Sequence, residues 1–536
     1  MTKTIETKKL QAIKKFIGKN QVACVTGAFF GDEAKGKMVD ELSKVSDAIA
    51  RVNSGENAGH TVYHNGKKFV FHLIPSAVMT GKKTFVGSNC VMDPINFMKE
   101  EVSLLSKNKI NYKNLQVGNV FIVHALHKLV DIMRDPNAST GKGMSAVHQD
   151  IVGKRAIRLE DFFNGNFNQL EKSINFWWPY LIKQGLLEKK NIQAILDNKK
   201  VPTHVKNCLK YKKGSDIQRY IISSVNRTIK NKAFPKTTNV QSQLTNITNA
   251  GNKVLLEGSQ SFFLANTEGT HYSSTTSANT TASGVYASSN MPLHFSVATL
   301  NVTKVPSSRV GSGANPGGYV EQDWFSKRGL TGDDLKKLNI DFEHSYDAFV
   351  NSIDRKGYQT ETIYLDADNK TVSLQNKKLT VNEALAISSC IQYAEFGATT
   401  GKPRVCGTLD LPHLAHTIKY QDKYLSISCL DRLDNLSKAL VVVGYLYEGA
   451  SEVSNGKLYK KGLLISTKND LPGEEILKNC RPIYKKLPGW QTSKALNKKN
   501  IDANLSNFLE FIETQTSCKI ISFGNGPLTN DLIYLK

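Results

Sequence analysis

Short apolar runs alternate along this chain with polar loops that are rich in glycine, serine and threonine. The first run, at 22–25, leads into a glycine-rich loop that extends to Lys37, and a helical pattern starts at Met38. This strand–loop–helix order places backbone N–H groups at the start of a helix, where they can bind an anion. Further polar loops lie at or near the ends of later apolar runs, at 139–143, 257–260, 270–283, 307–311, 396–404 and 523–527.

Loops of this kind, placed at strand ends, are typical of an open sheet of parallel strands. Such a sheet collects its strand-end loops along one edge, where ligands bind. We therefore predict an α/β fold with a large, mostly parallel central sheet flanked by helices, a P-loop-like phosphate site and inserted subdomains. The loop at 257–260 is predicted to follow a strand at 253–256.

Two local patterns predict further elements. Leu10, Ile13 and Ile17 fall on one face of a helix that Gly18 can end, so residues 1–20 are predicted to be a short amphipathic extension. An Asn-Gly pair at 65–66 separates two alternating runs, 61–64 and 67–74. This arrangement is typical of a β-hairpin.

Composition narrows the class of protein. With 40% hydrophobic residues among 536, the chain can bury a large core, which excludes general disorder. No apolar run approaches the roughly 18–20 residues needed to span a bilayer, so we predict no membrane segment. The eight cysteines form no CxxC pair, which argues against structural zinc and disulfides and favours a cytoplasmic location.

The chain is strongly basic, with 70 Lys and Arg against 47 Asp and Glu, a net charge of +23. A basic balance can indicate nucleic-acid binding. Lysine predominates, however, and it is scattered, with the densest stretch at 183–213. We interpret the excess as a solvated surface that also suits anionic small-molecule substrates, and we consider a nucleic-acid partner unlikely.

Two candidate motifs depart from familiar site patterns. Residues 31–37 have the spacing G-x-x-x-x-G-K, but Met38 follows where a Walker A loop has a serine or threonine for magnesium. The loop is therefore predicted to hold phosphate in a different way. His60 and His64 are four apart, as in a helical metal pair, but they lie in a segment of strand character, which argues against zinc.

The motifs in their order resemble those of the adenylosuccinate synthetase family. They are GDEAKGK at 31–37, NAGHT at 57–61, HLIPS at 72–76, STGKG at 139–143, EGSQ at 257–260, SANTTASG at 277–284, SRVG at 308–311 and FGATTGKPR at 396–404. The resemblance covers about residues 21–536, which implies a single domain after the extension at 1–20. Extra length at about 163–250 and 322–392 indicates insertions.

The resemblance implies an enzyme that ligates L-aspartate to the 6-position of IMP with GTP and Mg²⁺. The base that takes the N1 proton would be Asp32, and the acid at the 6-oxygen would be His60, with Lys35 as a third catalytic residue. Magnesium would be held by Asp32 and the carbonyl of Gly59. These roles explain why a carboxylate and a donor flank the reacting purine atoms.

The resemblance also implies binding residues for each substrate. The monophosphate nucleotide would contact Asn57, Thr140, Lys154, Arg155, Gln260, Thr276 and Val310. The aspartate would contact Thr399, Thr400, Lys402 and Arg404, and the triphosphate would contact Gly31, Gly36, Lys37, Asp431, Gly524 and Gly526. Family members are homodimers in which a basic residue reaches the neighbouring site, and here either Lys154 or Arg155 fits that role.

Two departures from the family pattern keep alternatives open. Lys402 stands where the family has an arginine near the ribose, and Cys429 replaces a lysine near the guanine of GTP. A related phage enzyme that joins aspartate to dGMP, with ATP or GTP, is therefore a second hypothesis. A basic nucleic-acid-binding protein on an inactive scaffold is a third.

Overall fold

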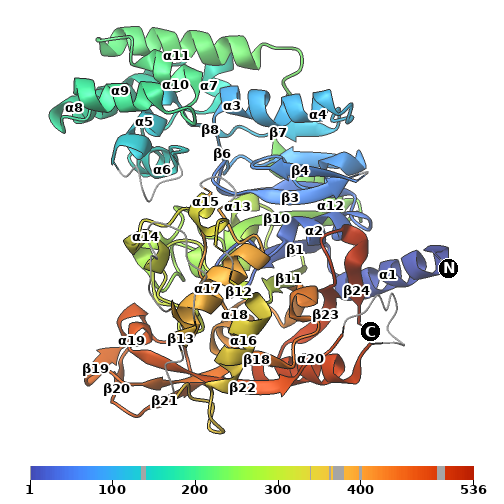
Figure 1. The fold of residues 1–536 in the computed structure, drawn as a ribbon. Coiled ribbons are helices and arrows are strands. Elements are labelled where there is room, and N and C mark those ends of the chain that lie inside the picture. The colour runs from blue at the N-terminus through green and yellow to red at the C-terminus, as the bar shows by residue number, and fades with distance from the viewer. Residues whose placement is uncertain are drawn as a thin grey trace.

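A ten-stranded sheet runs through the centre of the protein and carries the predicted site loops (Figure 1). The computed structural model describes residues 2–64, 66–134, 141–338, 340–360, 364–365, 379–397, 401–491 and 501–535. From one edge to the other the strands are β24 (Leu532–Tyr534), β23 (Lys519–Gly524), β17 (Tyr424–Ser428), β11 (Val297–Lys304), β1 (Val22–Gly27), β10 (Val254–Ser261), β2 (Ala48–Arg51), β5 (Lys83–Val86), β7 (Leu115–Val117) and β9 (Lys236–Thr237).

Every neighbouring pair in this sheet is parallel except β23 with β24. The central strand β1 is buried at all six positions, and Cys24 lies opposite Leu256 on one side and Thr299 on the other. Strands covered on both faces have near-continuous apolar sequences, as 22–25 does. The predicted α/β class with a mostly parallel sheet is confirmed.

The structure corrects two predicted boundaries. The segment 257–260, predicted as a loop, continues β10 as far as Ser261. Two carboxylates pair with hydroxyl groups at the ends of this segment, since Glu257 accepts from Ser76 and Glu33 accepts from Ser261. The second helix, α2 (Lys35–Ser43), begins at Lys35 and not at Met38, because the chain turns through a left-handed Ala34 directly before it.

Helices pack against the faces of the sheet and form a separate layer at one end of the molecule (Figure 1). That layer contains α5 (Ala125–Arg134), α6 (Met144–Val152), α7 (Leu159–Asn164), α8 (Asn168–Lys183), α9 (Lys189–Asp197), α10 (Thr203–Cys208) and α11 (Gly214–Ile229). Trp177 of α8 is buried among them. The predicted insertion at about 163–250 spans α8 to α11 and α12 (Val240–Asn249), and its status as an insertion stays a prediction.

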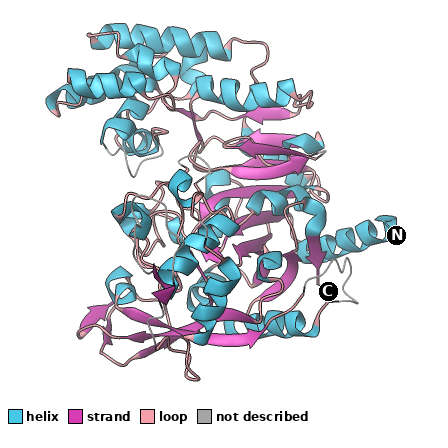
Figure 2. Ribbon diagram, in the orientation of Figure 1, coloured by secondary structure: helices cyan, strands magenta, loops and turns pink. Residues whose placement is uncertain are grey.

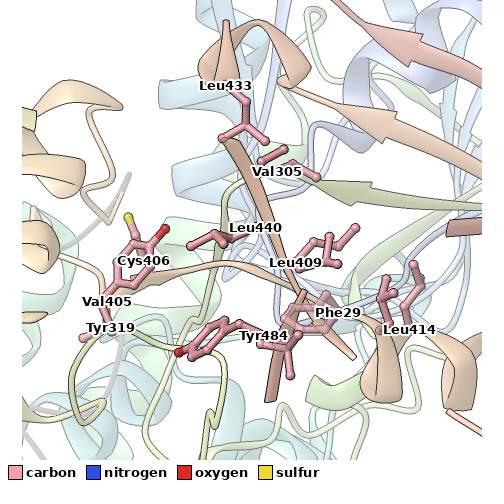
Figure 3. Packing of buried hydrophobic residues seen from close by; sticks show 14 of the residues in the cluster. Phe29, Val305, Tyr319, Val405, Cys406, Leu409, Leu414, Leu433, Leu440 and Tyr484 are labelled. Atoms are coloured by element: carbon pink, nitrogen blue, oxygen red, sulfur yellow. The ribbon is translucent and has the colours of Figure 1, made fainter. Parts of the chain in front are cut away.

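The largest hydrophobic core lies on the opposite side of the sheet, and Figure 3 shows part of it. It is enclosed by β16 (Leu409–Asp410), β18 (Lys438–Tyr447), β21 (Leu464–Ser466), β22 (Cys480–Pro488), α14 (Trp324–Lys327), α15 (Gly332–Leu335), α16 (Phe342–Asn351), α17 (Val381–Gln392), α18 (Leu411–Tyr420) and α20 (Ala503–Thr516). The predicted insertion at about 322–392 supplies α14 to α17. Within it, β13 (Tyr364–Leu365) pairs with β14 (Leu379–Thr380).

Shorter elements connect these layers. The predicted hairpin is confirmed as β3 (His60–His64) and β4 (Lys67–Phe71), which lie between the helical layer and the sheet (Figure 2); Asn65 lies outside the described residues. The other elements are α3 (Pro94–Asn96), α4 (Ser103–Lys107), α13 (Ala282–Ser289), α19 (Glu474–Lys478), β6 (Val91–Met92), β8 (Phe121–Ile122), β12 (Ser307–Ser308), β15 (Cys406–Gly407), β19 (Glu452–Ser454) and β20 (Lys457–Tyr459). Among the described residues, no helix has the length and apolarity to cross a membrane.

The predicted N-terminal helix forms α1 (Thr2–Ile17) and docks on the sheet. Ile13, Phe16 and Ile17 are buried in one core cluster with residues of β1, α2 and β11. The Phe16 ring packs edge-on against Tyr424 of β17, with ring centroids 5.1 Å apart. The extension is therefore part of the packed core.

We expect Phe16→Ala to lower the free energy of unfolding by about 3 kcal/mol, because it removes a buried aromatic side chain and leaves a cavity. Urea denaturation of the full-length chain measures this change. The matched control is Lys14→Ala on the exposed face of the same helix, which should change stability little. Equal effects of the two variants would contradict the docking of α1.

Candidate active site

The predicted site loops follow the carboxyl ends of neighbouring parallel strands. The phosphate loop follows β1, the SRVG segment follows β11, Cys429 follows β17 and the 523–527 segment follows β23. Segments that are hundreds of residues apart in the chain therefore share one edge of the sheet. This is the position at which open α/β sheets bind ligands.

A buried carboxylate shapes the phosphate loop from within. Glu33 Oε1 accepts hydrogen bonds from the backbone N–H groups of Phe29, at 2.8 Å, and Gly31, at 3.3 Å. Its other oxygen accepts from the Ser261 hydroxyl and lies 3.5 Å from Lys35 Nζ. Glu33 therefore closes the loop upon itself and fixes Lys35, which is also buried.

The loop holds two non-glycine residues in the left-handed region, Asp32 at φ 55° and Ala34 at φ 67°. This conformation costs roughly 1–2 kcal/mol per residue, so the contacts of Glu33 must outweigh it. Gly36 has a different role. A Cβ added there would lie 3.0 Å from the Thr61 carbonyl oxygen and 3.1 Å from Ser76 Oγ, so glycine allows α2 to approach β3.

The predicted triphosphate residues meet where α2 approaches the end of β23. Lys37 Nζ donates to the Gly526 carbonyl at 2.7 Å. Burial lowers the pKa of Lys37, while nearby acidic groups that include Asp431 act in the opposite direction. A Cβ at Gly524 would lie 3.4 Å from the Cys429 nitrogen and 3.5 Å from Lys37 Nζ. The structure thus brings Lys37, Gly524 and Gly526 together, with Asp431 nearby.

The predicted base and an aspartate-binding residue form an ion pair. Arg404 Nη1 contacts Asp32 Oδ2, and it also lies 3.8 Å from Glu395 Oε2. The Asp32 side chain is 35% exposed and that of Arg404 is 13% exposed, so the pair is only partly covered by the surrounding chain. The backbone N–H of Arg404 donates to the Glu395 carbonyl at 2.9 Å, which closes the 395–404 loop.

His60 is held by a second buried carboxylate. Its Nδ1 contacts Glu257 Oε1, and Glu257 also accepts from the Ser76 N–H at 2.8 Å and the Ser76 hydroxyl at 2.6 Å. Burial lowers the pKa of His60 below its ordinary value of 6.5, although Glu257 acts in the opposite direction. Burial would raise the pKa of Glu257, but His60 and Arg51 keep it below its ordinary value.

Several predicted nucleotide residues lie together. Asn57 Nδ2 donates to Thr276 Oγ1 at 3.3 Å. The Val310 N–H donates to the Phe30 carbonyl at 3.1 Å, next to Gly31. Both polar atoms of the Gln260 amide are buried and have no hydrogen-bond partner among the described residues.

The contacts described above do not include the remaining predicted residues. Lys154 is exposed, with φ 57°, and Arg155 lies on the Phe176 ring, 3.9 Å from its centroid. Lys402 is exposed. Gly59 directly precedes His60, and its role with Asp32 as a magnesium ligand stays a prediction. Three predicted residues lie outside the described ranges: Thr140, Thr399 and Thr400.

Sequence reasoning assigned no role to the three carboxylates that organise the site. Glu33 and Glu257 stand inside recognised motifs, and Glu395 directly precedes the FGATTG segment. An isolated carboxylate in an otherwise apolar or glycine-rich segment is the signal that could have identified each of them. What the sequence does not reveal is the set of cations that each one meets.

Comparisons with known proteins identify the family and the fold. The family model for adenylosuccinate synthetase matches residues 24–533. The chain belongs to the adenylosuccinate synthetase family. Adenylosuccinate synthetase 1 of Trypanosoma cruzi is 40% identical over 569 residues, covering 100% of this chain and 91% of the relative. The Trypanosoma brucei brucei adenylosuccinate synthetase is 37% identical over 554 residues, covering 97% and 90%.

The fold is also shared with a solved structure. The structure of fully ligated adenylosuccinate synthetase from Plasmodium falciparum superposes with a TM-score of 0.66 at 22% identity, and the match covers 96% of this chain and 100% of that one. The chain is thus an enzyme of purine nucleotide biosynthesis, a ligase that forms a C–N bond. The hypothesis of an inactive nucleic-acid-binding scaffold is wrong.

The contact between Glu257 and His60 predicts a pH effect. His60 is predicted to act as an acid, which requires its protonated form, so kcat/KM falls as pH rises through its pKa. Glu257→Gln removes the negative charge that raises this pKa. The pKa of His60 then falls further, and we expect the alkaline limb of the kcat/KM profile to move to lower pH. Glu268→Gln, at an exposed carboxylate, is the control, and an unmoved limb in Glu257→Gln would refute the role.

Proposed function

We propose that this enzyme joins L-aspartate to the 6-position of IMP, with GTP as the phosphoryl donor and Mg²⁺ as the cofactor. The ion pair between Asp32 and Arg404 supports this proposal best, because it places the predicted base for the purine beside the predicted ligand of the aspartate carboxylate. The eight cysteines are free thiols, which supports a reducing compartment, and we infer that the enzyme works in the cytoplasm.

The proposed reaction has two steps. Asp32 takes the N1 proton of IMP while the 6-oxygen attacks the γ-phosphorus of GTP, and GDP leaves. The neutral amine of aspartate then attacks C6, the C6–O bond breaks, and the 6-oxygen leaves with the phosphoryl group as phosphate, which takes the bonding electrons and the proton that the amine gives up. His60, oriented through Nδ1 by Glu257, has Nε2 left to stabilise the oxygen that gains charge.

In this scheme Asp32 has two successive partners. It pairs with Arg404 in this structure, and it would accept the N1 proton once Arg404 binds the substrate carboxylate. An arginine suits that role because its planar donor fork matches a carboxylate. The oxygen donors of Asp32 and Gly59 suit a hard cation, and magnesium held there would supply positive charge against the triphosphate oxygens.

We assign recognition of the guanine of GTP to the loop after β17. Asp431 there is partly buried, and burial raises its pKa. A carboxylate can accept two hydrogen bonds from N1 and N2 of guanine, whereas adenine offers no such pair of donors. Lys37 lies at the same junction and can serve the phosphates. This supports GTP as the donor.

Turnover with purified full-length enzyme tests the proposal. IMP, GMP and dGMP are each combined with GTP or ATP in the presence of aspartate and magnesium, and nucleoside diphosphate release and the aspartate adduct are measured. We expect adduct formation with IMP and GTP. Adduct formation with dGMP alone would favour the second hypothesis. Asp32→Asn, which should lower kcat at least ~10²-fold, is the catalytic control.

We expect Arg404→Leu to raise the KM for aspartate at least about tenfold, because a charged hydrogen-bonding partner of a carboxylate is lost. The KM values for IMP and GTP should change far less. Steady-state kinetics with each substrate varied in turn measure this difference. Arg481→Leu, at an arginine that is 39% exposed, is the matched control. Equal increases in all three KM values would instead indicate a loop that no longer folds.

We also propose a homodimer in which Arg155 reaches the monophosphate of the neighbouring site. Arg155 Nε donates to Asp150 Oδ1 at 2.8 Å, and its guanidinium lies over Phe176. Asp150 is itself held by His127 Nε2, at 2.9 Å, and by Ser173. The side chain is therefore oriented in advance by Asp150 and Phe176, and we infer that its terminal nitrogens serve the phosphate, which favours Arg155 over the exposed Lys154.

Subunit mixing tests the shared site. Arg155→Leu should raise the KM for IMP while leaving that for aspartate nearly unchanged, and Lys154→Leu is the control at the neighbouring position. An equal mixture of Arg155→Leu and Asp32→Asn subunits should recover about a quarter of wild-type activity, since half of the dimers are hybrids with one complete site. No recovery, with hybrid dimers shown by sedimentation, would refute the proposal.

A further inference from the structure

Arg432 directly follows Asp431, in the loop proposed to bind the guanine of the phosphoryl-donor nucleotide. The loop leaves β17 through a left-handed Cys429, at φ 63°, and continues as a short 3₁₀ turn, Leu430–Leu433. At position 429 the family has a lysine, so a cation that the family carries there is missing. Arg432 supplies a cation three residues later in the same turn.

The guanidinium of Arg432 does not lie free in solvent. Nη1 donates to Glu395 Oε1 at 2.7 Å, and Nη2 donates to the Tyr393 carbonyl at 3.0 Å. In return, the Tyr393 hydroxyl donates to the Arg432 carbonyl at 2.7 Å. The guanidinium carbon also lies 5.0 Å from the centre of the Tyr393 ring. Backbone and side chain of Arg432 are thus both tied to the 393–395 segment.

Glu395 is the common partner in this arrangement. Its carboxylate, 6% exposed, lies 2.8 and 2.7 Å from Lys304 Nζ and accepts from the Ser308 hydroxyl at 2.9 Å. Arg404 is 3.8 Å away. One buried carboxylate therefore contacts the donor-base turn, the segment after β11 and the arginine proposed to bind aspartate.

We propose that Arg432 is a positioning residue that couples the donor-nucleotide site to the aspartate site through Glu395. This inference rests on the substrate sites proposed above. When Arg404 turns to the substrate carboxylate, Glu395 loses one of its cations. Its charge is then balanced by Lys304 and Arg432. The 3₁₀ turn at 430–433, which carries Asp431, is therefore held more firmly in place.

The expected sign of the coupling is positive. Bound aspartate strengthens the contact between Arg432, in the turn at 430–433, and Glu395. The enzyme therefore binds the donor nucleotide more tightly. By thermodynamic reciprocity, bound donor nucleotide raises the affinity of the enzyme for aspartate by the same factor. Such couplings are typically about 5- to 150-fold in affinity. A residue that served only stability would change both affinities without changing their dependence on each other.

Calorimetric titration of GDP with magnesium tests the proposal, because GDP cannot turn over. The dissociation constant is measured on full-length enzyme with IMP, with and without saturating aspartate. In wild type we expect saturating aspartate to lower the dissociation constant of GDP at least about fivefold. In Arg432→Met we expect less than about a twofold effect, with an intermediate effect in Arg432→Lys, which keeps the charge but loses the planar fork.

Arg219→Met, at an arginine that is 78% exposed on α11, is the matched control and should keep the wild-type response. Thermal melting must show that Arg432→Met is folded, and Arg432→Lys provides the test if it is not. The inference is overturned if aspartate does not tighten GDP in wild type, or if the variants keep the full effect. Wild type that forms no adduct in the turnover assay would overturn the proposed function instead.

Discussion

The negative charge of Glu395 is buried where four segments of the chain meet, and the shape of the site depends on how that charge is paired. A buried carboxylate is tolerated only when cations and hydrogen-bond donors surround it, because removing it from water costs several kcal/mol. Lys304 and Arg432 provide that pairing, so the pKa of Glu395 lies below its ordinary range even though burial alone would raise it. Removing Lys304 or Arg432 would leave the carboxylate with fewer cations around it in the core.

Glu33 and Glu257 obey the same constraint at two other points. Glu33 closes the phosphate loop around its own N–H groups, and Glu257 holds His60 against the sheet. Each carboxylate is almost fully buried and contacts residues from more than one segment. The three together fix the loops on which the proposed catalytic residues stand, which is the kind of support a site needs to hold its groups in position.

The parallel sheet makes this arrangement possible. All its internal strands point the same way, so the ends of β1, β11, β17 and β23 deliver their loops to one edge. The chain provides little polar surface within these strands, and the carboxylates Glu33 and Glu257 are paired with residues of other segments. The site is thus built at the boundary where apolar strands give way to polar loops.

Much of this organisation follows from the sequence alone. Apolar runs of strand length followed by glycine-rich loops determine a parallel sheet with a ligand edge, and the motif residues Asp32, His60, Lys37 and Arg404 all lie on that edge or beside it. Local pattern is sufficient here, because strand length, loop composition and glycine content act over a few residues. It failed at 257–260, where polar residues continue a strand because their partners lie on other segments.

The tertiary structure alone decided which charges meet. Glu395 is distant in sequence from Lys304 and Arg432, and no periodicity relates them. Sequence does not separate positions 154 and 155, since both are basic; the structure shows that Arg155 contacts Asp150, while its role at the neighbouring site stays a proposal. Long-range ion pairs depend on how loops from different strands are brought together, and that is a property of the folded chain rather than of any one segment.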